Sequence, residues 1–294
     1  MAETTAVRAE AGTAPQQRRI VWAGSGMPAS DGAGVKLMRV IGQPRLPDLD
    51  PFLMLDEFGS DDPGAYIAGF PEHPHRGFET VTYMLAGAMR HRDNKGNVGL
   101  LGPGWIQWMT AGRGILHSEM PEQEEGLMRG FQLWINLPAK DKLCAPRYQD
   151  VAPERIPHVV LAAGVEAKVL VGNIGGVHGP VETGVTDPLY LDLSFAAGAA
   201  SEITLPAEHN GFVYVYEGAL EAGAEAAAQK LGKGTIGVLS TGDRLRLAAG
   251  PEGAKALLIA GKPLREPVAK YGPFVMNTRE EIQQAFVDFQ AGKF

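Results

Sequence analysis

Short apolar and β-branched runs, separated by turns rich in glycine and proline, recur along most of the chain. The clearest is GFETVTYML at residues 77–85, where alternation and β-branched content are typical of a strand. Similar runs lie at residues 35–40, 52–55, 105–109 and 128–137. The chain also has 38 glycines and 21 prolines, so the pattern predicts a turn-rich, all-β protein.

The two halves of the chain carry matching segments. HRGFETVTY at residues 75–83 matches HNGFVYVY at residues 209–216, and LLGPG at residues 100–104 matches VLSTG at residues 238–242. The second copies follow at nearly equal distances, which indicates a duplicated domain. We therefore expect two tandem antiparallel β-barrels. Their boundary falls between Leu137 and Asp187, and we place it at residue 150, which gives barrels at 19–150 and 151–294.

Both ends of the chain differ from this strand pattern. Residues 1–18 are mostly small and polar, so we expect a flexible N-terminal arm, and they lack the apolar core of a signal peptide. Near the other end, Thr278 and Glu281 have the spacing of a capping box. An apolar stripe at helical spacing follows and consists of Ile282, Ala285, Phe286 and Phe289. The sequence thus predicts a short C-terminal helix docked on a barrel.

Four potential metal ligands form two pairs, each at spacing i, i+2. His73 and His75 make the first pair, and His117 and Glu119 the second. Because alternate side chains of a strand point to the same face, each pair aims two donors at one place. Two neighbouring strands would then supply three imidazoles and one carboxylate. This set suits a catalytic first-row metal better than a structural zinc.

Other acidic and histidine residues leave alternatives open. Glu79 shares strand parity with His73 and His75, so it is either the oxygen ligand itself or a partner that orients an imidazole. Glu119 is favoured as the ligand because it repeats the spacing of the first pair. His91 is a lone histidine in a predicted hairpin, where a hydrogen-bonding or exposed role is expected.

Aromatic and sulfur-containing side chains near these residues are candidates for an apolar pocket or for barrel core. The pocket candidates are Phe78, Trp108 and Met109, with Trp105 and Trp134 as further possibilities. The second half lacks the ligand pattern, since Ala207 is the counterpart of His73 and no histidine follows His209. Metal chemistry is therefore predicted for the first half only.

Composition narrows the setting of this chemistry. The formal net charge of −7 and the absence of a basic stripe argue against direct nucleic-acid binding. A single cysteine excludes an internal disulfide, and no stretch is long and apolar enough to span a bilayer. We expect a cytoplasmic protein without a membrane partner.

The four ligands leave coordination positions open on a six-coordinate metal. Fe(II) and similar ions use such positions for a substrate oxygen and O2, which predicts an oxygenase that binds an enolate-like group. The ligands alone would also accept Mn, Co, Ni, Cu or Zn. Glu119 is the candidate catalytic residue, because its carboxylate can accept the proton of a substrate hydroxyl.

At these residues the chain resembles the pirin family of the cupin superfamily. The segments that carry the resemblance are GFPEHPHRGFETVTYML at 69–85, QWMTAGRGILHSEMP at 107–121, FQLWINLP at 131–138 and LREPVAKYGPFVMNT at 264–278. The resemblance implies a bicupin fold with one metal, held by His73, His75, His117 and Glu119. One position departs from the family pattern, where Trp105 replaces the usual aspartate.

The resemblance implies two functions. One is a quercetin 2,3-dioxygenase, which cleaves a small aromatic flavonol with O2 and releases carbon monoxide, and for this function Fe(II) is the expected metal. The other is an iron-dependent regulatory protein, which binds a transcription factor or a metabolic enzyme as its partner.

Overall fold

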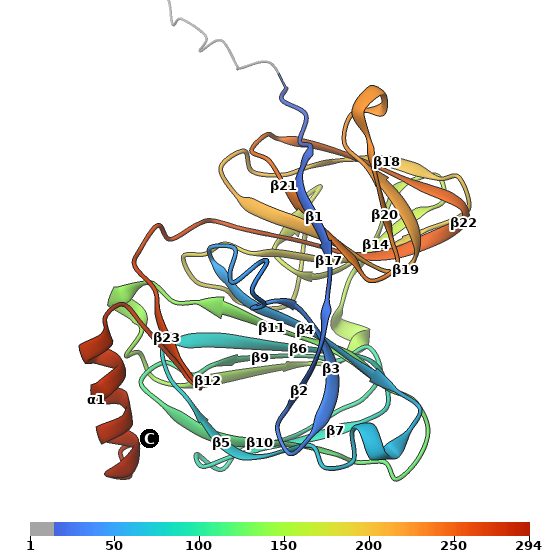
Figure 1. Ribbon diagram of the computed structural model, residues 1–294. Coiled ribbons are helices and arrows are strands. Elements are labelled where there is room, and N and C mark those ends of the chain that lie inside the picture. The colour runs from blue at the N-terminus through green and yellow to red at the C-terminus, as the bar shows by residue number, and fades with distance from the viewer. Residues whose placement is uncertain (1–14) are drawn as a thin grey trace, which may run out of the picture.

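The computed structural model describes residues 15–294 and shows two stacked groups of β-sheets with one helix at the side (Figure 1). The prediction of a mostly β protein with a short C-terminal helix is confirmed. The predicted N-terminal arm lies largely outside the described residues. Within the described part of the chain, no helix is both long enough and apolar enough to cross a bilayer.

The N-terminal half contains two sheets. The seven-stranded sheet has the order β12-β9-β6-β11-β4-β3-β2, and the four-stranded sheet has the order β5-β10-β7-β8. The seven strands are β2 (Met27–Asp31), β3 (Val35–Ile41), β4 (Phe52–Ser60), β6 (Phe78–Ala86), β9 (Ile106–Thr110), β11 (Met128–Asn136) and β12 (Arg147–Val151). The four are β5 (Phe70–His75), β7 (Met89–Asp93), β8 (Val98–Leu101) and β10 (Ile115–Pro121).

The C-terminal half is built on one sheet of nine strands. Its order is β1-β21-β19-β22-β17-β14-β13, with β18 paired to β22 and β20 paired to β19. These strands are β1 (Ile20–Ser25), β13 (His158–Ala162), β14 (Val165–Val171), β17 (Leu189–Phe195), β18 (Ala200–Thr204), β19 (Asn210–Ala222), β20 (Gln229–Gly232), β21 (Thr235–Leu239) and β22 (Arg244–Gly261). The remaining elements are the pairs β15 (Asn173–Ile174) with β16 (Val177–His178) and β23 (Ala269–Tyr271) with β24 (Phe274–Met276), the helix α1 (Arg279–Gln290), and short 3-10 turns at Pro63–Ala65, Ala139–Asp141, Pro153–Arg155 and Glu225–Ala227.

The two large sheets share one strand order. In the N-terminal half the central strands run β9-β6-β11-β4-β3, and in the C-terminal half the corresponding strands run β21-β19-β22-β17-β14. β6 and β19 contain the matching sequence segments, so the repeat in the sequence is also a repeat in topology. The strand order of each sheet is open at both ends, so the predicted closure into barrels is not confirmed.

One strand of the C-terminal sheet comes from the N-terminal end of the described chain. β1 pairs with β21 and completes the edge of the C-terminal sheet, in the position that β12 takes beside β9. Just before it, Arg18 is fully buried, and its guanidinium donates to the carbonyl oxygens of Pro206, His209, Ser240 and Gly242. The last residue of the predicted arm is therefore ordered, because a buried guanidinium must be satisfied by acceptors.

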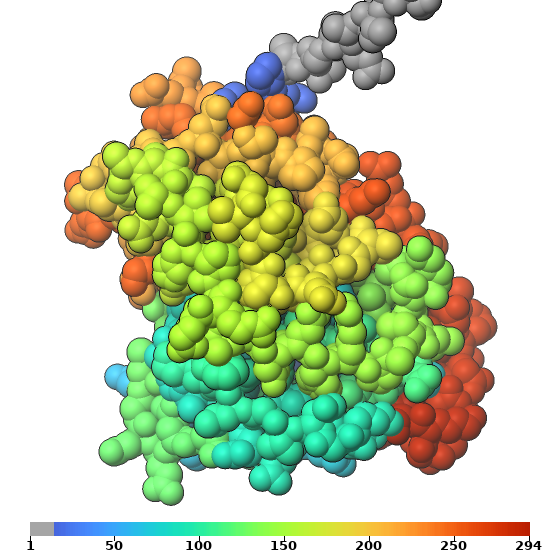
Figure 2. Space-filling model, turned by 180° about the vertical axis from the view of Figure 1, so that it is seen from behind, coloured from blue at the N-terminus to red at the C-terminus, as the bar shows by residue number. Residues whose placement is uncertain are grey.

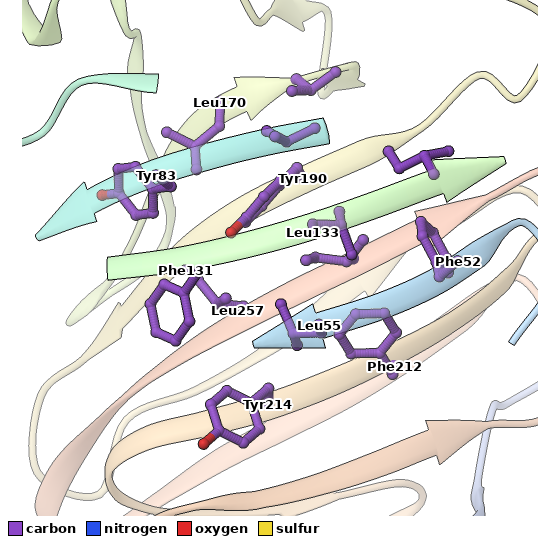
Figure 3. Close-up of a cluster of buried hydrophobic side chains, with 14 of the residues drawn as sticks. Phe52, Leu55, Tyr83, Phe131, Leu133, Leu170, Tyr190, Phe212, Tyr214 and Leu257 are labelled. Atoms are coloured by element: carbon purple, nitrogen blue, oxygen red, sulfur yellow. The ribbon is translucent and has the colours of Figure 1, made fainter. Parts of the chain in front are cut away.

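The halves meet along one apolar cluster that draws side chains from both large sheets (Figure 3). The N-terminal half contributes Phe52, Leu55, Tyr83, Phe131 and Leu133, and the C-terminal half contributes Leu170, Tyr190, Phe212, Tyr214 and Leu257. A strand segment that is covered on both faces has no solvated side, which explains the continuous buried runs at residues 78–84 of β6 and 211–216 of β19. The seven-stranded sheet therefore keeps its second face for the interior of the N-terminal half.

The C-terminal segment returns to the N-terminal half after β22. The β23–β24 hairpin and α1 pack there, and Figure 2 shows this segment in red against the side of the molecule. The predicted capping box is confirmed, since Thr278 Oγ1 accepts from the backbone N–H of Glu281 and the Glu281 carboxylate accepts from that of Thr278. Arg76 ties the helix down through an ion pair of 2.9 Å with Asp288. This contact fixes the residue that follows His75.

Candidate metal centre

Three histidines converge where β5 pairs with β10. The two strands are antiparallel, and His73 lies directly opposite His117 in their register. His75 shares a face with His73, and all three offer ring nitrogens within 4.8 Å of one another. The ring centroid of His73 lies 4.7 Å from that of His75 and 4.3 Å from that of His117. The spacing of the two sequence pairs thus places three imidazoles at one point.

Backbone carbonyls set the tautomers of two of these rings. Nδ1 of His73 lies 2.8 Å from the carbonyl oxygen of Pro71, and Nδ1 of His75 lies 3.4 Å from that of Pro273. A carbonyl can only accept, so each Nδ1 carries the proton and each Nε2 keeps its lone pair. These two Nε2 atoms are 3.1 Å apart. Two lone pairs at this distance repel each other unless a cation lies beside them.

The third imidazole, that of His117, also has a buried nitrogen that a cation would satisfy. His117 is 1% exposed, and its Nε2 is buried without a hydrogen-bond partner among residues 15–294. Burial lowers the pKa of His75 and of His117 well below the usual value, and the neighbouring histidines lower both further. The rings of His75 and His117 therefore remain neutral, which is the form that ligates metals. A divalent cation fits this donor set.

Glu119 forms a second group with His91 and His117, again within 4.8 Å, and it shares only His117 with the group of three histidines. Its carboxylate accepts from Thr82 Oγ1 at 3.1 Å and from Gln132 Nε2 at 3.0 and 3.2 Å. It is 2% exposed. Two donors from the seven-stranded sheet therefore hold this carboxylate at the edge of the histidine cluster.

His91 belongs to the site, although its sequence context did not indicate this. It is 1% exposed and lies opposite Glu119 in the pairing of β7 with β10. Its Nδ1 is 3.5 Å from Nδ1 of His117, so it can accept the proton that His117 carries on that nitrogen when Nε2 binds a metal. Of the two predicted roles, the hydrogen-bonding one fits and the exposed one does not.

Glu79 does not face the site. On β6 it shares a face with Val81 and Tyr83, which pack in the cluster between the halves, whereas Thr82 on the other face reaches Glu119. Its carboxylate accepts from Thr110 Oγ1 at 2.7 Å, and burial raises its pKa. The parity argument from His75 fails because Gly77, at φ +87°, turns the chain between β5 and β6 and resets the alternation. Glu79 is neither positioned to ligate nor placed to orient an imidazole.

A cavity of about 650 Å³ adjoins the histidines. His73, His75 and Trp134 form part of its wall, together with residues of β3 and β4 and with Lys270 and Pro273 from the C-terminal segment. Its volume falls within the range of about 300–1,000 Å³ that is usual for pockets holding small organic ligands. The site is thus open to a substrate of that size.

Of the aromatic and sulfur-containing residues expected in the pocket, Trp134 lines the cavity, whereas the others lie elsewhere. Phe78, Trp108 and Met109 are fully buried, and the cavity wall contains none of them. Trp108 packs between the two halves, and Met109 packs beneath the sheet, where it contacts the hydroxyl of Tyr148. Phe78 supports the site from behind, with its ring centroid 5.0 Å from that of His75.

Trp105, the departure from the family pattern, also lies away from the cavity wall. It is half-buried and packs against an apolar cluster that includes Leu37, Phe58 and Met89. These three residues do line the cavity. The indole therefore supports one end of the cavity from outside.

The duplicated strand order, with histidine clusters found in only one half of residues 15–294, is that of a protein with two cupin domains. A solved structure of quercetin 2,3-dioxygenase from Acinetobacter baumannii has the same fold, with a TM-score of 0.87 and 33% identity over 95% of this chain and 99% of that chain. The pirin family profile matches residues 34–135, and the profile of the pirin C-terminal cupin domain matches residues 190–294. The chain belongs to the pirin family.

Relatives in distant organisms support this assignment. A Pseudomonas aeruginosa protein named "Putative quercetin 2,3-dioxygenase" is 53% identical over 91% of this chain and 95% of its own length. Mouse pirin is 47% identical over 90% of this chain and 89% of its own length. The similarity therefore covers both halves of the protein.

Proposed function

We propose that this chain is a metal-dependent dioxygenase that cleaves flavonols of the quercetin type with O2. The observation that carries the proposal is the meeting of three imidazoles, two of which (His73 and His75) line a cavity large enough for a small aromatic substrate. The names of the relatives with high identity and of the solved structure support the same reaction class. The regulatory alternative has no comparable support from the cavity or from these relatives.

The proposed ligands are His73, His75, His117 and Glu119, with Fe(II) as the expected ion and Mn, Co, Ni, Cu or Zn as other ions that the donors accept. A bound first-row metal supplies a Lewis acid with open positions for a substrate oxygen and O2. His91 would orient His117, while Thr82 and Gln132 orient Glu119.

The protein's own groups then have two tasks. Glu119 accepts the proton of the substrate's 3-hydroxyl, since its carboxylate is held in place by two donors and is ready to accept. The cavity holds the aromatic rings beside Trp134, within reach of the proposed ligands His73 and His75. In the overall reaction both atoms of O2 enter the opened product, and one carbon leaves as carbon monoxide with an oxygen of the substrate.

The test is turnover of quercetin, followed by loss of its visible absorption band and by detection of carbon monoxide. Iron-loaded wild type is expected to be active, His117→Ala to lose activity by at least about a hundredfold, and His178→Ala, at an exposed histidine of the other half, to match wild type. Equal turnover by wild type and His117→Ala, with or without metal, would exclude the mechanism.

A further inference from the structure

A row of polar residues crosses the floor of the cavity. Thr82, Gln132, Asp56 and Arg39 stand side by side on β6, β11, β4 and β3, each the cross-strand partner of the next. All four line the cavity. The first two hold Glu119, so the row begins at the metal centre and extends across two further strands.

The far end of the row is a carboxylate fixed by a guanidinium. Asp56 is 2% exposed, and Arg39 donates to both of its oxygens, from Nε at 3.0 Å and from Nη2 at 2.7 Å. Arg39 also donates to Asp31 at 2.8 Å. One cation is therefore shared by two carboxylates, and each oxygen of Asp56 retains a lone pair for a further donor. The group presents a preorganised acceptor to the cavity.

The rows on either side are apolar. Leu37 is the partner of Phe58 in one row, and Met54 is the partner of Trp134 in the other, and all four line the cavity. A flat aromatic ring can lie across these rows with its edge at the polar row between them. The cavity as a whole is lined by three carboxylates (Asp31, Asp56 and Glu72) and two cations (Arg39 and Lys270), and this excess of negative charge disfavours an anionic ligand and favours a neutral hydroxyl that donates.

We propose that Asp56, held by Arg39, is a specificity-determining residue that accepts a hydrogen bond from a phenolic hydroxyl of the substrate. This hydroxyl is distinct from the 3-hydroxyl assigned to the metal centre, because Asp56 lies one strand beyond the residue that contacts Glu119. The inference rests on the proposed function and specifies it: the preferred substrate is a polyhydroxylated flavonol. A site built around a hydroxyl rejects analogues that lack it, since the acceptor is then left without a partner.

The experiment compares two ligands under anaerobic conditions, where binding is separated from turnover. Quercetin carries hydroxyls on both outer rings, whereas 3-hydroxyflavone keeps only the 3-hydroxyl and the neighbouring carbonyl. Dissociation constants are measured by fluorescence quenching for metal-loaded wild type, Asp56→Asn and Asp61→Asn. The last is a matched control, since Asp61 is exposed and lies outside this cavity.

Wild type and Asp61→Asn are expected to prefer quercetin by at least about tenfold, the size of one hydrogen bond to a charged group. Asp56→Asn is expected to lower this preference to about threefold or less while its affinity for 3-hydroxyflavone stays close to that of wild type. A preference that is unchanged in Asp56→Asn overturns the inference.

A panel on wild type alone covers the case in which Asp56→Asn does not fold. Flavonols that lack the hydroxyls of one outer ring at a time should show a tenfold loss for one ring only, and equal affinities across the panel overturn the inference. The outcomes also separate the two proposals. If wild type cleaves quercetin but shows no preference for ligands with outer-ring hydroxyls, only this inference is excluded. If wild type neither binds nor cleaves either flavonol, the proposed function is excluded.

Discussion

The turn before β6 and the corresponding turn before β19 each carry a histidine, but only the first of these histidines belongs to the candidate metal centre. His75 precedes β6 and His209 precedes β19, and both imidazoles are buried. In the first half His73 and His117 join His75 with their lone pairs facing inward. In the second half Ala207 replaces the first ligand, and no second strand brings a histidine to His209 within the described residues.

In the second half, the cation is a side chain of the protein. The buried guanidinium of Arg18 is held by four carbonyl oxygens, two from the turn before β19 and two from the loop after β21. Carbonyl oxygens suit a hydrogen-bonding guanidinium, whereas imidazole nitrogens with free lone pairs suit a transition metal. Similar topology therefore holds a fixed side-chain cation in one half and a set of imidazoles that could bind an exchangeable ion in the other.

The largest expected effect comes from removing the fixed cation. Arg18→Met leaves four carbonyl oxygens without their donor, two of them in buried hydrogen bonds, and we expect it to cost about 3–5 kcal/mol of stability and about 10 °C in Tm. The measurement is thermal unfolding followed by circular dichroism. Arg18→Lys should lose less, because an ammonium can still reach some of the carbonyls. If Arg18→Met unfolds at the same temperature as wild type, the guanidinium does not stabilise the fold through these carbonyl oxygens.

The matched glycines of the two turns give the next contrast. Gly77 has φ +87°, and a Cβ there would lie 1.9 Å from the carbonyl oxygen of Val275, whereas a Cβ at Gly211 would lie 3.0 Å from that of Ile259. Gly77→Ala should therefore cost about 2–4 kcal/mol and Gly211→Ala about 1 kcal/mol in urea unfolding. Only Gly77→Ala should also weaken metal binding, since it shifts the residue two positions before it. Equal losses in both variants would contradict the contrast.

A smaller effect is expected from the partner of His117. His91→Ala removes the acceptor 3.5 Å from Nδ1 of His117, which should weaken metal affinity roughly tenfold. Competition with a chromophoric chelator measures the change. His178→Ala in the C-terminal half is the control and should bind as wild type does. An unchanged affinity in His91→Ala would show that this contact does not orient the ring.

Local patterns were sufficient to predict part of this structure. The i, i+2 spacing of His73 and His75 works because both lie within one strand, where alternation holds. The capping box of Thr278 and Glu281 is equally local. The internal repeat could be found because the matched segments form corresponding strands of the two sheets.

The remaining features depend on contacts between distant segments. His91 enters the site only through the register of β7 on β10, and Glu79 leaves it because of the turn at Gly77. The cavity wall includes Trp134 and Lys270, which lie more than a hundred residues apart in the sequence. Alternation within one strand cannot supply this information, since register is set by pairing and by turn geometry.

Metal content is the most direct test of the difference between the halves. Wild type, His117→Ala and His209→Ala are loaded with Fe(II) without oxygen, desalted and analysed for iron. The account predicts roughly one ion per chain in wild type and in His209→Ala, and less than about a tenth of that in His117→Ala. Full iron content in His117→Ala, or loss of iron in His209→Ala, would contradict it.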